Sequence, residues 1–192
     1  MTGSDGSVYY SDDHYKTFKK VEQTPRRMNR KLLYESSPPW VLIHLLTEED
    51  KKWLPAVLFK ESGFSPAIRI LRGQKMRNRQ SLMDEFGAAL QFSEPFGENW
   101  YALKDCLSYL HEWMSGDAFI LTVIRPQEVL IEEPDELQWL LLTIREAGEW
   151  WSHPITDNGI YNRNSVPFHL VLQCDQKELE EVRRRFGDIS LL

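Results

Sequence analysis

The sequence has few cysteines and no long apolar run, and each shortage excludes a class of protein. Only Cys106 and Cys174 are present among 192 residues. Each lies inside an apolar stretch, which favours two buried thiols over a disulfide or a metal site. No run approaches the roughly 20 apolar residues that a membrane span needs, and the first residues lack the basic-then-apolar order of a secretory signal. We therefore expect a soluble cytoplasmic protein that does not contact a membrane.

The sequence also lacks the motifs of common enzymes and cofactor sites. None of its five histidines forms an H-x-x-x-H or H-E-x-x-H pair, so the spacing of a metal site is missing. The motifs G-x-S-x-G, G-x-G-x-x-G and the phosphate-binding P-loop do not occur either. Glu132 and Glu133 are more typical of a solvated turn than of an acid–base pair. We therefore predict that the protein is not an enzyme and uses no cofactor or metal.

Basic side chains are scarce in one part of the chain. Residues 94–150 contain three basic and twelve acidic side chains, whereas the whole chain has a formal net charge of −6. A surface of this sign repels the phosphates of nucleic acid. We therefore expect no direct nucleic-acid partner. The acidic side chains either keep the protein soluble or complement a basic protein partner.

The N-terminal third of the chain is uneven in composition. Residues 1–38 are polar and include the basic segment KKVEQTPRRMNRK, which predicts a flexible arm. The apolar run WVLIHLL at 40–46 is suited to a buried strand, and Thr47 with the three following acids favours the start of a helix. We expect residues 39–66 to form an extension that packs on the core.

From residue 67 onward the pattern alternates between strands and helices. Short apolar or alternating runs predict strands, and apolar steps of three and four residues predict helices. The expected strands are 67–71, 118–124 and 166–173, and the expected helices are 79–90, 98–114, 134–151 and 176–186. This order predicts an α/β domain over 67–192 that ends in a helix. Its sheet should be small and mainly parallel, with three strands or slightly more and helices packed on it.

The segment SEPFGENWYALKDCL at 93–107 combines a Pro-Phe-Gly turn with the start of a helix. Gly97 is expected to allow a sharp turn, and Trp100, Leu103 and Leu107 define the buried side of the helix. The residues expected on or beside the exposed side are Glu98, Tyr101, Lys104, Asp105 and Ser108. On this pattern alone, Asp105 is a simple surface acid.

The same segment resembles the signature of the barstar family, the intracellular inhibitors of the secreted ribonuclease barnase. In that family a Y-G-E-N turn leads into a helix that reads D-A-L-W-D-C-L, and this chain has F-G-E-N, then Trp100, then Y-A-L-K-D-C-L. AIRILRG at 67–73 is similar to the family's first strand, and IREA at 144–147 is similar to F-R-E-A in its third helix. The resemblance covers residues 67–174 and implies a barstar-like fold.

The resemblance implies that this helix and the loop before it plug the cationic active site of a ribonuclease. In the family an aspartate of the helix takes the place of the substrate phosphate. This role corresponds to Asp105, the turn corresponds to Gly97 and Asn99, the acid of the third helix corresponds to Glu146, and the buried cysteine corresponds to Cys106.

The sequence departs from the family at three positions of the segment. Tyr101 stands where the family has an aspartate, Lys104 where it has a tryptophan, and Pro95 where it has a tyrosine, while Phe96 keeps an aromatic side chain in the loop. The face expected to bind a partner therefore consists of Asp105, Tyr101, Glu146, Asn99, Gly97, Phe96, Lys104, Glu98 and Ser108.

Two functions are compatible with these patterns. The first is an inhibitor or immunity protein that acts as a monomer and neutralises a nuclease, expected to be a secreted ribonuclease toxin, by plugging its basic active site. The second is an interaction module of barstar-like fold that binds another basic protein without inhibiting it. Only the inhibitor would abolish the turnover of a nuclease at one equivalent.

Overall fold

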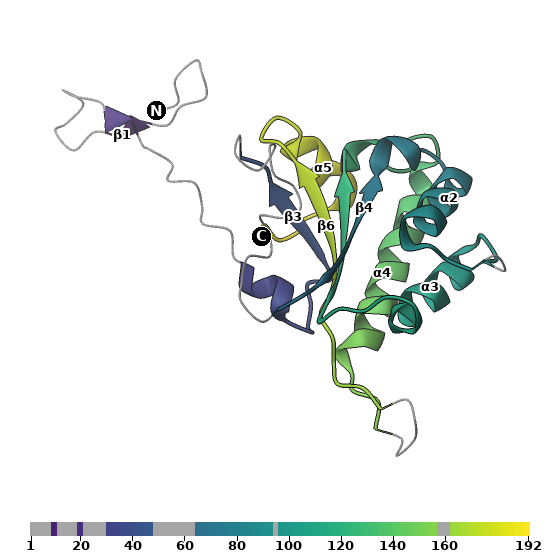
Figure 1. Cartoon of the computed structure of the whole chain (residues 1–192). Coiled ribbons are helices and arrows are strands. Elements are labelled where there is room, and N and C mark those ends of the chain that lie inside the picture. The colour runs from purple at the N-terminus through teal and green to yellow at the C-terminus, as the bar shows by residue number, and fades with distance from the viewer. Residues whose placement is uncertain (1–8, 11–18, 21–29, 48–63, 94–95, 157–161) are drawn as a thin grey trace.

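A four-stranded parallel sheet forms the centre of the fold (Figure 1). The computed structural model describes residues 9–10, 19–20, 30–47, 64–93, 96–156 and 162–192. The strands β3 (Val41–Leu45), β4 (Ala67–Arg72), β5 (Phe119–Ile124) and β6 (Phe168–Cys174) lie in the order β3-β6-β5-β4. All three neighbouring pairs are parallel. The predicted α/β class with a mainly parallel sheet is therefore confirmed.

In the described part of the chain, four helices lie between or after these strands. They are α2 (Arg79–Leu90), α3 (Trp100–Ser108), α4 (Leu137–Ser152) and α5 (Leu179–Phe186). The short 3-10 helices among the described residues are η1 (Arg30–Tyr34), η3 (Gly73–Lys75), η4 (Leu110–Glu112), η5 (Pro126–Glu128) and η6 (Pro134–Glu136). Two further strands, β1 (Tyr9–Tyr10) and β2 (Lys19–Lys20), pair antiparallel outside the main sheet. None of the described helices is long and apolar enough to cross a membrane.

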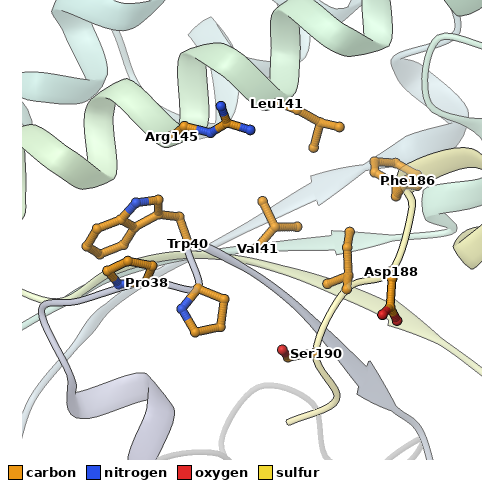
Figure 2. Close-up of a pocket in the computed structure, with 10 residues that line it drawn as sticks. Pro38, Trp40, Val41, Leu141, Arg145, Phe186, Asp188 and Ser190 are labelled. Atoms are coloured by element: carbon orange, nitrogen blue, oxygen red, sulfur yellow. The ribbon is translucent and has the colours of Figure 1, made fainter.

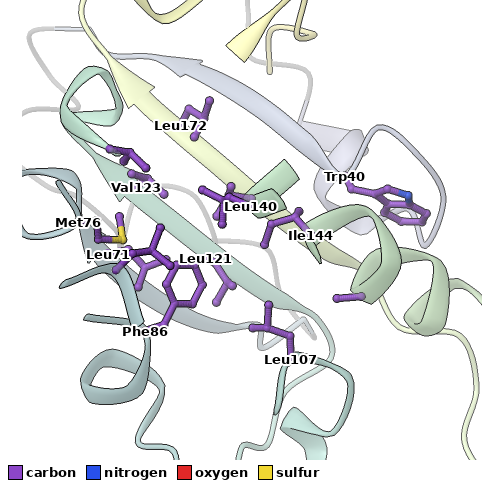
Figure 3. Packing of buried hydrophobic residues seen from close by; sticks show 14 of the residues in the cluster. Trp40, Leu71, Met76, Phe86, Leu107, Leu121, Val123, Leu140, Ile144 and Leu172 are labelled. Atoms are coloured by element: carbon purple, nitrogen blue, oxygen red, sulfur yellow. The ribbon is translucent and has the colours of Figure 1, made fainter. Parts of the chain in front are cut away.

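The main hydrophobic core lies between the sheet and the four helices (Figure 3). Leu121 and Leu172 reach it from the two central strands, and Phe86, Leu107 and Ile144 reach it from α2, α3 and α4. All five side chains are completely buried. Each contributes about 1.5–3 kcal/mol relative to an exposed side chain. This packing explains why the helical stripes read from the sequence are apolar.

A smaller core on the other face of the sheet includes part of the predicted arm. Leu33 of η1 is completely buried there against Leu42, Ile120 and Val171. The ring nitrogens of His169 on β6 also lie 3.0 and 3.1 Å from the carbonyl oxygens of Glu35 and Pro39. The prediction of a flexible arm up to residue 38 is therefore wrong for this last part, because its apolar side chain has a hydrophobic surface to cover.

The residues before the family-like region supply a strand of the sheet itself. β3 pairs along its whole length with β6, so residues 41–45 do more than pack on the core as an extension. Trp40, just before β3, packs on α4, where a Cβ atom built on Gly148 would lie 2.4 Å from its Cδ2. The helix expected after Thr47 lies outside the described residues.

The C-terminal tail contacts β3 from the side opposite β6. The N–H of Ile43 donates to the carbonyl of Ser190 at 2.9 Å, and the N–H of Leu192 donates to the carbonyl of Ile43 at 2.8 Å. Figure 1 shows the C-terminus beside β3. The N-terminal extension and the tail thus complete one side of the sheet together.

The predicted helices differ from the observed ones mainly at their ends. The helix expected over 98–114 starts only at Trp100 and stops at Ser108, because the N–H of Tyr109 donates to Cys106 in a tighter 3-10 turn. The C-terminal helix begins at Leu179. Asp175 and Glu178 each accept a hydrogen bond from the other's backbone N–H, as predicted, but these bonds close the turn before the helix, whose N-cap is Glu178.

We predict that Gly148→Ala destabilises the fold, because the new methyl group would overlap the ring of Trp40. Overpacking of this kind costs about 1–3 kcal/mol. Gly87→Ala in α2 is the matched control. Its methyl group would lie 3.6 Å from Phe96, an ordinary contact, and alanine favours helix formation. Urea unfolding should show a loss for Gly148→Ala only, and equal stability of the two variants would contradict the packing.

Arg72 at the end of β4 joins the sheet to α2 through Glu85. The carboxylate of Glu85 is buried and accepts the Arg72 backbone N–H at 2.9 Å and its guanidinium N–H groups at 2.8 and 2.7 Å. Burial raises the pKa of Glu85, but the hydrogen bonds and charge of Arg72 outweigh it, so the net pKa is lowered.

Because the pKa of Glu85 is lower in the folded protein, the unfolded chain binds the proton more readily. The stabilisation is therefore present above the ordinary glutamate pKa of about 4.3 and is lost as the pH falls through the lower folded value. We predict that Glu85→Gln removes this part of the pH dependence of the unfolding free energy. The exposed Glu112→Gln control should keep it. An unchanged pH profile of Glu85→Gln would exclude this role.

Candidate functional site

Two tryptophan side chains join α3 to α4, one near each end of α3. The indole N–H of Trp100, at the start of α3, donates to the carboxylate of Glu136 at 2.7 Å. The indole N–H of Trp151, near the end of α4, donates to the carbonyl of Leu107 at 2.8 Å. The start of α3 thus lies near the start of α4 and the two helices run side by side in parallel (Figure 1). These bonds fix the face of α3 that points away from the core.

The turn before α3 is built from an aromatic contact and one unusual backbone conformation. Phe96 packs on Phe92 at the end of α2, with 4.9 Å between the ring centroids. The residue with a left-handed backbone is Glu98, with φ of 46°, and not Gly97. The expectation for Gly97 is therefore wrong. Its small size matters instead, because a Cβ atom there would lie 3.3 Å from the Cβ atom of Ala102.

Asn99 ends this turn and starts the helix. Its side-chain oxygen accepts the N–H of Ala102 at 3.1 Å, and its side-chain nitrogen donates to the carbonyl of Gly97 at 2.8 Å. Such a cap satisfies a backbone donor that the first helical turn leaves free. The carboxylate of Glu98 accepts a hydrogen bond from Gln80 of α2 at 2.7 Å. Both side chains therefore hold the turn in place.

Asp105 lies on the exposed side of α3. Its side chain is 68% exposed, and its nearest charged partner is the ammonium group of Lys104 at 3.7 Å. An exposed pair of this kind contributes little to stability, so the carboxylate remains accessible to a partner. Tyr101, one turn earlier, is 82% exposed. Asp105, Tyr101 and Lys104 are thus brought together as expected, whereas their role in binding stays a prediction.

Ser108 does not lie on the exposed side with them. Its side chain is buried, and its hydroxyl donates to the carbonyl of Lys104 at 2.9 Å. Ser108 follows the exposed Tyr101 by seven residues, so helical spacing alone would place both on the same side of α3, and the burial of Ser108 does not follow from that spacing. The expected exposure of Ser108 is therefore wrong.

A groove of about 360 Å³ lies between α3 and α4. Tyr101 and Lys104 line it from α3, and Glu146 lines it from α4. Trp139 and Leu142 complete its apolar wall, and both are exposed. These two residues were not among those predicted from the sequence to form the site. The sequence did contain an indication of their role, because both are large apolar residues outside the buried stripe of α4.

A second cavity, of about 300 Å³, lies on a different side of α4 (Figure 2). Leu141 and Arg145 of α4 face Trp40 across it, and the tail residues around Asp188 close its far side. None of the residues expected to bind a partner lines this cavity.

The cysteine of α3 is half-buried, and it is not paired with Cys174. Burial and the neighbouring charge of Asp105 raise the pKa of the Cys106 thiol, which makes the nucleophilic thiolate scarce at neutral pH. Among the described residues, no three histidine, cysteine or acidic side chains lie close enough together to hold a metal ion. The chemistry of this face is therefore that of a carboxylate beside aromatic rings.

Comparisons with known proteins identify a family and a similar fold. The family model described as "Barstar (barnase inhibitor)" matches residues 67–173, which extend from β4 through β6. No curated protein matches the chain.

Among solved structures, the Aeropyrum pernix ORC2 protein in its ADP form is 14% identical, with a TM-score of 0.50. The match covers 82% of this chain and 42% of that chain. The ADPNP–ADP complexes of the same protein match with 12% identity and a TM-score of 0.44, over 79% of this chain and 41% of that chain. This chain thus spans less than half the length of each of these two structures, and the first match shows a likeness of fold alone.

We predict that Trp151→Phe loosens α3, because the buried carbonyl of Leu107 would lose its donor. An unsatisfied buried group costs about 1–3 kcal/mol. Trp100→Phe is the control, because its bond to Glu136 is only partly buried and water can replace the indole. Urea unfolding should show the larger loss for Trp151→Phe, and amide exchange should become faster in α3. A smaller loss than for Trp100→Phe would contradict this assignment.

Proposed function

Because the chain belongs to the barstar family, whose members inhibit barnase-type ribonucleases, we propose that it binds such a ribonuclease through the exposed side of α3. In this proposal the protein acts as a monomer, and α3 and the preceding turn enter the basic active site of the enzyme. RNA can then no longer reach the catalytic groups.

The observation that carries the proposal is the exposed carboxylate of Asp105 on a helix held at both ends. A ribonuclease active site gathers cationic side chains to hold a phosphodiester. A carboxylate on a rigid support can accept charge-assisted hydrogen bonds from those side chains, and it cannot be cleaved. Glu146 on α4 lines the groove beside α3 and provides a second acid near the same surface.

The charge of this part of the chain supports a basic partner. Residues 94–150 contain twelve acidic side chains against three basic ones. A strong field of one sign raises the rate at which an oppositely charged protein is captured. The field also makes the association dependent on salt.

The positions at which this chain differs from the family signature affect which ribonuclease it can bind. Tyr101 and Lys104 replace an aspartate and a tryptophan of the family signature, and both line the groove beside α3. The chain therefore offers fewer acids and a different aromatic surface to its partner. We propose a ribonuclease whose surface differs from that of barnase at these contacts. A basic protein that binds the same face without being inhibited is the alternative.

We predict that Asp105→Asn weakens inhibition at least tenfold by faster dissociation, because the partner's cations would be buried without their counter-charge. Glu112→Gln is the control. Glu112 is an exposed acid in η4, and its loss should mainly lower the association rate at low salt. Association and dissociation rates with barnase-type ribonucleases, together with RNA cleavage at one equivalent, provide the measurement.

Three outcomes of this experiment are informative. If Asp105→Asn dissociates as slowly as the parent protein, Asp105 is not the anchor. If the parent protein binds a ribonuclease but leaves RNA cleavage unchanged, the interaction module is the better description. If it binds none of the ribonucleases, the proposed target class is wrong.

A further inference from the structure

Exposed apolar side chains are concentrated on α3 and α4. In the described part of the chain, eight large apolar side chains are exposed. Five of them lie on α4 or on α3 and the residue that follows it, namely Tyr101, Tyr109, Trp139, Leu142 and Trp150. Clustered exposed aromatic residues are typical of binding surfaces. The groove beside Asp105 is bordered by three of the five.

Four large apolar or aromatic side chains line the groove together with charged side chains and Thr143. Trp139 and Leu142 form the wall on the side of α4, and Trp100 and Tyr101 form the wall on the side of α3. The indole N–H of Trp100 is used by its bond to Glu136. An occupant of the groove would therefore gain mainly by burying apolar surface.

The charges around the groove are balanced. Arg79 and Lys104 provide two positive side chains, and Glu136 and Glu146 provide two negative ones. Lys104 also lies near the carboxylate of Asp105. A cationic or anionic occupant would meet charges of both signs, so attraction and repulsion would largely cancel. A neutral occupant would not need this electrostatic attraction to bind. The lining therefore favours a neutral apolar group over an ion.

We infer that this groove receives one large neutral side chain of the protein partner, of the phenylalanine or leucine type. The inference rests on the proposed function, because the groove adjoins the Asp105 surface and both would contact the same partner. Its volume of about 360 Å³ lies at the lower end of the range of binding pockets, which suits a single side chain. Trp139 and Leu142 would then determine which ribonucleases bind, next to the common carboxylate contact.

One methylene group more or less in a hydrophobic pocket changes recognition by about 10- to 200-fold, and we expect the groove to discriminate between partners by at least that factor. A ribonuclease with a large apolar residue beside its basic active site would be preferred over one with a charged residue there. The carboxylate of Asp105 would attract both ribonucleases, and the groove would make the affinity for the first higher than the affinity for the second.

The test uses the full chain alone and needs no ribonuclease. N-acetyl-L-phenylalanine amide serves as the probe, and N-acetyl-L-arginine amide serves as its charged counterpart. We expect NMR shifts at Tyr101, Trp139 and Leu142 that saturate with a dissociation constant on the order of 1 mM. The arginine probe should bind at least tenfold more weakly. Stronger binding of the arginine probe, or the absence of saturable shifts at these residues, would overturn the inference.

Two variants of α4 make the test specific. Trp139→Ala removes one wall of the groove and should weaken binding of the phenylalanine probe at least tenfold. Trp150→Ala removes a similarly exposed tryptophan of the same helix that does not line the groove, and it should stay within twofold of the parent protein. Equal effects of the two variants would overturn the inference, and so would shifts in the groove that depend on protein concentration without any probe.

The result can be separated from that of the proposed function. The measurement on Asp105→Asn reports on inhibition of a ribonuclease, whereas this titration reports on the groove in the protein alone. Failure of the titration would leave the Asp105 contact standing. Failure to inhibit any ribonuclease would leave a mapped groove without its proposed partner.

Discussion

The fixed position of α3 against α4 is the constraint on which the candidate site depends. Trp100 and Trp151 each donate an indole hydrogen bond across the two helices, one near each end of α3. Between these two points α3 has little freedom to rotate about its axis. The direction of Asp105, the exposure of Tyr101 and the width of the groove beside Trp139 all follow from that arrangement.

The periodicity of the sequence was sufficient to predict the elements from residue 67 onward, because each one buries a regular apolar stripe against a common core. The partner of the 41–45 strand could not be predicted in this way. Its pairing with β6 joins segments far apart in the chain, and no local pattern encodes such a pair. The burial of Leu33 has the same origin, because two adjacent leucines in a polar segment give no periodic signal.

The sequence predicted the parts of the candidate site for which the resemblance supplied a motif. It predicted less well the parts whose exposure or backbone conformation depends on contacts between elements. The exposure of Asp105 and Tyr101 followed from helical spacing. The burial of Ser108 depends on tertiary packing that helical spacing does not encode, and the left-handed backbone of Glu98 depends on how the turn packs on α2. The groove is formed by residues of both α3 and α4, so Trp139 and Leu142 could be assigned to the site only from the structure.

The tail beside β3 has a consequence for how copies of the protein meet. An outer strand whose backbone N–H and C=O groups are free is a template on which another chain can pair and aggregate. Ser190 and Leu192 already bond the middle of β3. At the opposite border of the sheet, β4 has the charged side chains of Arg69 and Arg72, which disfavour such pairing. Both borders of the sheet thus have features that disfavour edge-to-edge pairing with the sheet of another chain.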